Sequence, residues 1–302
     1  MRPIYREEPC RSALNRVTGM PFAWSLNPYM GCAHRCAFCY VRAFERRADR
    51  PSDERYGTTV RIKTNFVQVL RLELARRSWA REPVAIGAAT DPYQPAEARY
   101  RLTRGTIEAL TDFRTPFHII TRGPMIVRDL DVLTRAATRV KVRVNVSISS
   151  LDRRAWRELE PGSPAPAARL KAVRTLTDAG IDVSIAIAPV LPGVTDDPAT
   201  LEALVRAARE AGATRVWARG LYLAAGTREH FLAVLTRTWP EERARYDQLY
   251  ARGAYLPREE EARLKTLVGG LSQRHGVSDR RAIRLEPTAE EAEAVQLDLG
   301  IG

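Results

Sequence analysis

The sequence predicts an α/β fold: a partial (β/α)6 barrel of the TIM-like kind, followed by a helical C-terminal extension. Three observations lead to this prediction. Short β-rich runs alternate six times with helical stretches, one of these runs has a polar face, and the last part of the chain is helical and charged. The 302 residues, 45% of them hydrophobic, are enough to bury the core of one large domain.

The alternation is regular from the first run to the last. The β-rich runs cover residues 25–29, 84–90, 116–121, 140–149, 182–188 and 214–222. The helical stretches cover residues 65–81, 103–113, 124–138, 165–179 and 198–211. Gly180 and Gly212 follow directly after two of these stretches, as helix stop signals do. Such alternation predicts a parallel sheet with crossover helices, whose chemistry lies at the carboxyl ends of the strands.

The run 140–149 distinguishes a barrel from a doubly wound sheet. Its apolar positions are Val140, Val142, Val144, Val146 and Ile148, and the alternating positions are Arg139, Lys141, Arg143, Asn145, Ser147 and Ser149. A parallel sheet covered only by helices is apolar on both faces. The polar face therefore predicts a lumen that holds a polar ligand.

The pattern divides the chain into an N-terminal segment (1–19), a barrel core (20–225) and a helical extension with a tail (226–302). Pro240 and Pro257 are expected breaks in the extension, and the acidic stretch from residue 287 is expected to be a small helix or a tail. The amino terminus is charged, and the most apolar later run, 185–194, contains two prolines. We therefore expect neither a signal peptide nor a membrane span.

The chain is strongly basic, with a net charge of +12. Such a charge attracts phosphate-rich partners, which makes a nucleic-acid substrate one interpretation. The basic residues are interspersed with acidic ones, however, and nearly all of them are arginine, so a general compositional bias explains the charge equally well. The charge alone leaves the two interpretations open.

Three of the four cysteines, Cys32, Cys36 and Cys39, form a C-x3-C-x2-C pattern. Three thiolates on one short loop can each bind one iron of a cubane cluster. No cysteine follows Cys39, and Cys10 lies outside the loop, so the pattern predicts a 4Fe-4S cluster with one open iron. Clustering of this kind also favours metal ligation in a reducing cytoplasm over disulfide formation.

Two alternatives remain for the same cysteines. With His34 they could form a Cys3His zinc site in a non-catalytic nucleic-acid-binding module, although His34 is only two residues from Cys32 and Cys36, which is tight for a zinc loop. A small electron-transfer protein would need a fourth cluster ligand.

The cysteine pattern directly after the first predicted strand, with Phe38 before the last cysteine, resembles the radical S-adenosylmethionine (SAM) superfamily. Further segments resemble the subgroup around spore photoproduct lyase and occur in matching order across about residues 20–225. These segments are 25–32 (SLNPYMGC), 90–95 (TDPYQP), 121–122, 128–130, 147–151, 159–161 and 188–193. The resemblance implies reductive cleavage of SAM to a 5'-deoxyadenosyl radical that abstracts hydrogen from a substrate. It also implies a reductant such as flavodoxin or ferredoxin.

The resemblance and the predicted strand ends together suggest the remaining site residues. The candidates for contact with SAM are Thr90, Asp91, Asn145, Ser147, Ser149 and Arg219. Thr90 and Asp91 stand where radical SAM proteins usually have a glycine-rich motif, and an Asp-Pro pair is also an ordinary turn. Tyr93 and Tyr100 are candidate hydrogen-atom donors, although packing is the commoner role of a single tyrosine. Spore photoproduct lyases use a donor cysteine after the cluster motif, which this chain lacks, so we predict that it repairs spore photoproduct poorly.

Overall fold

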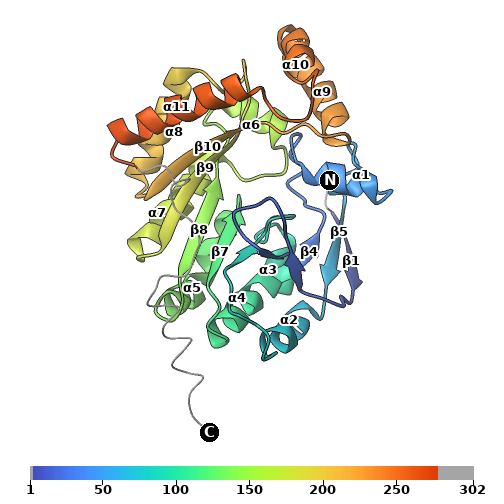
Figure 1. The fold of residues 1–302 in the computed structure, drawn as a ribbon, viewed down its shortest axis with the longest axis vertical. Coiled ribbons are helices and arrows are strands. Elements are labelled where there is room, and N and C mark those ends of the chain that lie inside the picture. The colour runs from blue at the N-terminus through green and yellow to red at the C-terminus, as the bar shows by residue number, and fades with distance from the viewer. Residues whose placement is uncertain (1–2, 278–302) are drawn as a thin grey trace.

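The computed structural model describes residues 3–277, and its central feature is a seven-stranded sheet in the order β10-β9-β8-β7-β6-β3-β2 (Figure 1). Strands β3 and β6 to β10 run parallel, and β2 is antiparallel to β3. The strands are β2 (Leu14–Arg16), β3 (Trp24–Leu26), β6 (Val84–Ile86), β7 (Phe117–Thr121), β8 (Val142–Ser147), β9 (Asp182–Val190) and β10 (Arg215–Gly220). Six parallel strands in sequential order confirm the predicted partial barrel.

Helices connect the parallel strands, mostly where the sequence predicted them. They are α1 (Val41–Arg47), α2 (Phe66–Leu74), α3 (Ala96–Tyr100), α4 (Leu102–Asp112), η1 (Pro124–Asp129), α5 (Leu130–Ala137), α6 (Arg153–Leu159), α7 (Pro166–Asp178) and α8 (Pro198–Glu210). Gly180 and Gly212 have φ angles of +81° and +83°, as expected of glycines that terminate helices. The short helices α1, α3 and α6 were not predicted.

The polar face of β8 lies inside the barrel, as predicted. Arg143, Asn145 and Ser147 are all buried on this strand. Arg143 Nε lies 3.2 Å from Asp182 Oδ2 on β9, and Asn145 Oδ1 accepts a hydrogen bond from Trp217 Nε1 on β10 (3.2 Å). Polar groups on nearby strands of the sheet therefore pair with one another, while Arg143 Nη1 has no hydrogen-bond partner among the described residues.

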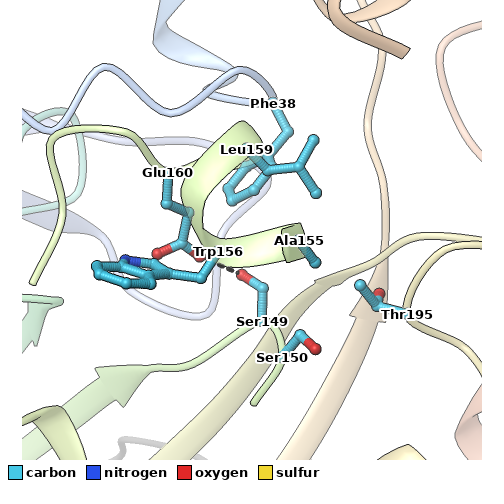
Figure 2. A pocket seen from close by; sticks show the side chains of 8 residues that line it. All are labelled: Phe38, Ser149, Ser150, Ala155, Trp156, Leu159, Glu160 and Thr195. Atoms are coloured by element: carbon cyan, nitrogen blue, oxygen red, sulfur yellow. Dashed lines mark hydrogen bonds between the residues drawn. The ribbon is translucent and has the colours of Figure 1, made fainter. Parts of the chain in front are cut away.

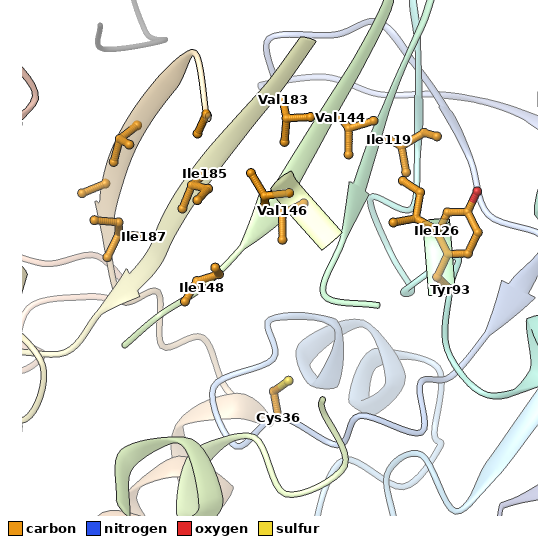
Figure 3. Packing of buried hydrophobic residues seen from close by; sticks show 14 of the residues in the cluster. Cys36, Tyr93, Ile119, Ile126, Val144, Val146, Ile148, Val183, Ile185 and Ile187 are labelled. Atoms are coloured by element: carbon orange, nitrogen blue, oxygen red, sulfur yellow. The ribbon is translucent and has the colours of Figure 1, made fainter. Parts of the chain in front are cut away.

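The apolar face of the same strands packs against the surrounding helices. Figure 3 shows residues of this face on β8, directly after it and on β9: Val144, Val146, Ile148, Val183, Ile185 and Ile187, all of them buried. Cys36 lies beyond the carboxyl ends of these strands in the same view. The sheet thus presents its carboxyl edge to the cysteines, which is the edge where barrels of this kind carry their chemistry.

A second, three-stranded sheet was not predicted. It consists of β1 (Ile4–Glu8), β5 (Thr59–Lys63) and β4 (Tyr29–Met30), with β5 in the centre. The run predicted as a single strand, 25–29, divides at Pro28 into β3 and β4, which belong to different sheets. Proline cannot donate a ladder hydrogen bond, which explains the break.

The C-terminal extension is helical, as predicted, and its breaks lie at the two prolines. It contains α9 (Thr227–Thr238), η2 (Pro240–Glu242), α10 (Arg243–Leu249) and α11 (Arg258–Arg274). Helix α11 packs beside α8 and along β10 (Figure 1). The acidic stretch from residue 287 lies outside the described residues. Among residues 3–277, no helix is both long enough and apolar enough to cross a membrane.

Candidate active site

The cysteine loop (residues 31–40) begins directly after β4 and is fixed at its first residue. Gly31 has a φ angle of +81°, and a Cβ atom there would lie 2.7 Å from Thr59 O. Its carbonyl oxygen accepts hydrogen bonds from Thr90 Oγ1 (2.8 Å) and Gln94 Nε2 (3.1 Å). Thr90, predicted to contact SAM, therefore holds the start of the loop.

The middle of the loop packs against the turn after α6. The backbone N of Ala37 donates to Leu159 O (2.8 Å), and that of Gly162 donates to His34 O (3.0 Å). A side chain at Gly162 would collide with the backbone oxygen of Ala33. The loop is thus held from the side of α6 by close backbone contacts.

Arg42, in the first turn of α1, is almost entirely buried and holds the loop from the other side. Its guanidinium donates to the backbone oxygens of Cys36 (3.2 Å), Ser52 (2.8 Å) and Asp53 (2.5 Å). It also lies 4.6 Å from the centre of the Tyr56 ring. A buried cation needs such partners, and it brings a fixed positive charge to the cysteine loop.

The three thiols of the loop are free, and none of them forms a disulfide. Cys36 Sγ lies 3.7 Å from Ser163 Oγ, and Cys39 Sγ lies 3.6 Å from Tyr56 Oη. Each of these two sulfurs therefore has a neighbouring hydroxyl from a separate part of the chain. Burial raises the pKa of the Cys36 thiol to about 12.

His34 forms a buried pair with Asp91, with Nδ1 3.3 Å from Oδ2. Asp91 also accepts hydrogen bonds from Tyr93 N (2.9 Å), Thr121 Oγ1 (2.6 Å) and Arg122 N (2.6 Å). Burial alone would raise the pKa of Asp91, but His34 and the hydrogen-bond donors outweigh it and lower this pKa to about 2. Both carboxylate oxygens are thus engaged by the protein itself.

The zinc-site alternative is not supported. Within residues 3–277, no three His, Cys, Asp or Glu side chains converge as ligands of a single metal ion. His34, which that site would need, points a ring nitrogen at Asp91. A cubane cluster places each thiolate on its own iron, so its ligands need not converge on one point.

Arg122, which follows β7, brings a second guanidinium to the loop. It lies 5.5 Å from the centre of the Phe38 ring, and its Nη2 donates to Ala188 O (2.9 Å). Its Nε is 3.7 Å from Glu160 Oε2 and has no hydrogen-bond partner among the described residues. In the sequence, Arg122 is distinguished only as part of the matching segment 121–122. A guanidinium with an unused buried N–H is a natural partner for a carboxylate.

Glu160 lies between the Arg122 guanidinium and the Ser149 hydroxyl on the lumen side. It accepts a hydrogen bond from Ser149 Oγ (2.8 Å) and pairs with the buried Arg169. Figure 2 shows both Ser149 and Glu160 in a small pocket between Phe38 of the cysteine loop and Trp156 of α6. The pocket therefore combines an apolar wall with a hydroxyl and a carboxylate beside the loop.

The other predicted cofactor contacts occupy different levels of the barrel. Asn145 is buried, and its amide oxygen accepts hydrogen bonds from Ser184 (3.0 Å) and Trp217 (3.2 Å). Ser147 is buried one layer higher, and Arg219 is exposed at the end of β10. Of the six candidates, Thr90, Asp91 and Ser149 contact the cysteine loop or the charged groups beside it through their side chains, and Ser147 O accepts a hydrogen bond from Arg169 Nη1 (3.0 Å).

The two predicted tyrosines lie in different surroundings. Tyr93 is buried in the hydrophobic core, next to Ile126 in Figure 3. Tyr100 donates its hydroxyl to Glu7 Oε1 (2.7 Å), on β1 of the small sheet. Two other tyrosines lie closer to the thiols: Tyr40 is the last residue of the loop and donates its hydroxyl to Ala88 O, and Tyr56 Oη lies beside Cys39 Sγ. The adjacency of Tyr40 to Cys39 was a sequence signal for the first, and Tyr56 had none.

The chain is similar to proteins of one family. The family model described as the radical SAM superfamily matches residues 26–205. An uncharacterised protein of Mycobacterium tuberculosis is 43% identical over 256 residues, which cover 84% of this chain and 75% of that protein. A radical SAM Nalpha-GlyT isomerase of Pseudomonas phage M6 is 27% identical over 170 residues, covering 55% of this chain and 33% of that protein.

The fold is similar to that of spore photoproduct lyase. A variant of that enzyme with bound AdoMet and dinucleoside spore photoproduct superimposes with a TM-score of 0.67 at 16% identity. The match covers 90% of this chain and 79% of that one.

Proposed function

The chain belongs to the radical SAM superfamily, and we propose that Cys32, Cys36 and Cys39 hold a 4Fe-4S cluster with one iron left open for SAM. The observation that carries this proposal is the set of three free thiols on one clamped loop, at the carboxyl edge of the sheet. We assign the catalytic core to residues 20–225 and the helical extension to the residues after it.

The residues around the loop fit such a group. A cluster with three thiolate ligands carries negative charge into a largely buried site, and buried charge requires compensation. Arg42 of α1 and Arg122 after β7 supply two guanidinium groups there. Phe38 and the packed turn after α6 shield the thiols from water.

Arg122 is our choice for the group that binds the SAM carboxylate, because its Nε has no hydrogen-bond partner among the described residues.

Ser147, Ser149 and Asn145 supply hydroxyl and amide groups on the lumen side, and Arg219 supplies a further cation at the rim. Thr90 and Asp91 support the site mainly through their bonds to Gly31 and to the Arg122 backbone. When bound together, the cluster and SAM supply a 5'-deoxyadenosyl radical that takes a hydrogen atom from the substrate.

We assign a nucleic-acid component to the substrate. The net charge of +12 favours phosphate-bearing molecules. The structure of spore photoproduct lyase, which shares the fold, holds a dinucleoside.

Tyrosine is our candidate for hydrogen-atom donor, with Tyr93 and Tyr100 as the positions predicted from sequence. A one-electron carrier such as flavodoxin or ferredoxin would supply the electron, in a reducing compartment such as the cytoplasm.

The test is anaerobic reconstitution of the full chain with iron and sulfide, followed by addition of dithionite and SAM. We expect a brown protein that forms 5'-deoxyadenosine, with more product when the correct class of substrate is present. DNA, RNA and peptide fractions are the three arms of the comparison. A colourless protein that binds zinc and leaves SAM intact would overturn the proposal.

A further inference from the structure

Two thiols of the cysteine loop, those of Cys36 and Cys39, each lie beside a side-chain hydroxyl. Tyr56 Oη lies 3.6 Å from Cys39 Sγ, and Ser163 Oγ lies 3.7 Å from Cys36 Sγ. Both hydroxyls come from segments outside the cysteine loop, so the pattern does not follow from the cysteine spacing.

We propose that the Tyr56 and Ser163 hydroxyls donate hydrogen bonds to the sulfur ligands of the cluster and thereby raise its reduction potential. The inference rests on the proposed function, since it requires that Cys36 and Cys39 are cluster ligands. A ligating thiolate has no proton and can only accept, so each hydroxyl must be the donor. Hydrogen bonds to the sulfurs are among the factors that set the potential of iron-sulfur clusters.

Tyr56 is positioned for this role by its surroundings. The side chain is 2% exposed, and the Arg42 guanidinium lies over its ring at 4.6 Å. Arg42 is itself fixed by the backbone oxygens of the cysteine loop. The phenol is therefore held against Cys39 by the same contacts that hold the loop.

Ser163 is held just as firmly, through its backbone. Its N donates to Glu160 O (2.9 Å), and its carbonyl oxygen accepts from Trp156 Nε1 (3.0 Å). Both bonds remain when serine is replaced by alanine, so this substitution removes the hydroxyl alone.

The direction of the effect follows from charge. Reduction adds one electron to the cluster, with no bond made or broken in the protein. A hydrogen-bond donor stabilises the more negative, reduced form more than the oxidised form. Removing a donor therefore makes reduction harder and shifts the potential to a more negative value.

The experiment measures the reduction potential of the reconstituted full chain by EPR-monitored titration with dithionite. Tyr56→Phe and Ser163→Ala are each expected to shift the potential to a more negative value, and the double variant is expected to shift it further. Iron and sulfide contents are measured for every sample. Tyr40→Phe is the matched control, because it removes a phenol from the same loop that donates to Ala88 O rather than to sulfur.

The possible results distinguish a failure of this inference from a failure of the proposed function. Unchanged potentials in Tyr56→Phe and Ser163→Ala, with full iron content, would overturn the inference and leave the cluster in place. An equal shift in Tyr40→Phe would also overturn it, because the effect would then be unrelated to the sulfurs. Absence of a cluster in the unaltered chain would instead be a failure of the proposed function. If Tyr56→Phe fails to fold, Ser163→Ala still decides the question.

Discussion

His34 Nδ1 lies 3.3 Å from Asp91 Oδ2, and this buried pair joins the cysteine loop to the segment that follows β6. The same carboxylate accepts a hydrogen bond from the backbone N of Arg122, after β7 (2.6 Å). Asp91 therefore ties together three segments at the carboxyl edge of the sheet. Although Asp91 belongs to an Asp-Pro turn, these contacts link it to both the cysteine loop and Arg122.

Replacing Asp91 by alanine should destabilise the fold and weaken SAM binding while leaving the cluster in place. Breaking a buried ion pair by removing one partner costs about 3–5 kcal/mol. Denaturant unfolding of the apoprotein measures the first effect, and equilibrium SAM binding and iron content of the reconstituted protein measure the others. Unchanged stability together with unchanged SAM affinity would reduce Asp91 to a simple turn residue.

The same carboxylate should make stability depend on pH in the acid range. The pKa of Asp91 in the folded chain is about 2, below its ordinary value of 3.8. The carboxylate therefore stabilises the fold above the unfolded pKa, and this contribution is lost as the pH falls towards the folded one. Between about pH 5 and pH 3, the free energy of unfolding should fall more steeply for the unaltered chain than for Asp91→Asn. Asp178→Asn, at an exposed helix end, should keep the steep slope.

Alanine at Cys32, Cys36 or Cys39 should remove cluster assembly and SAM cleavage together, because each thiolate is assigned its own iron. Cys10→Ala should retain both, since the backbone N of Cys10 bonds to Asn65, away from the loop. Iron and sulfide content and 5'-deoxyadenosine yield are the two measurements. Loss of the cluster in the Cys10 variant, with retention in a Cys36 variant, would show that the ligand assignment is wrong.

Replacing Arg122 by glutamine should weaken SAM binding. A hydrogen bond to a charged group contributes about 1.5–3 kcal/mol, which corresponds to a loss of at least about tenfold in affinity. Arg122→Lys should restore part of the affinity, because it keeps the charge but not the fork geometry. Arg135→Gln, on the exposed face of α5, is the control and should bind SAM normally. Normal binding in Arg122→Gln would assign the SAM carboxylate to another group.

The sequence was most informative where a periodic pattern existed. Alternation of the run 140–149 predicted a buried polar face, and Asn145 is indeed buried inside the barrel. Helix stops at Gly180 and Gly212 were predicted because only a residue free of a Cβ atom adopts their φ angles easily.

Contacts between segments distant in the sequence had no such signal. Tyr56 Oη lies beside Cys39 Sγ because two features hold residues 52–60 next to the loop. These are the hydrogen bond from Arg42 to Ser52 O and the short strand β5. The separation of β3 from β4 at Pro28 had a local cause, but the pairing of β4 with β5 depends on tertiary packing. Such short strands have too few residues for an alternating pattern to show.

The reaction of this chain should differ from the repair of spore photoproduct. Spore photoproduct lyases return a hydrogen atom from a cysteine placed after the cluster motif, and no cysteine follows Cys39 in this chain. Cys10, the remaining cysteine, lies beside Asn65 at the start of α2 rather than at the loop. We therefore expect the reconstituted protein, given dithionite, SAM and dinucleoside spore photoproduct, to form 5'-deoxyadenosine with little repair.

Chromatography of both products over time gives the ratio of repair to SAM cleavage. If a tyrosine is the donor, Tyr93→Phe or Tyr100→Phe should lower turnover of the physiological substrate without lowering iron content. Rapid conversion of spore photoproduct to two thymines, at close to one repair per 5'-deoxyadenosine, would contradict the prediction. It would show that a hydrogen-atom donor other than a cysteine placed after the cluster motif serves that repair reaction efficiently.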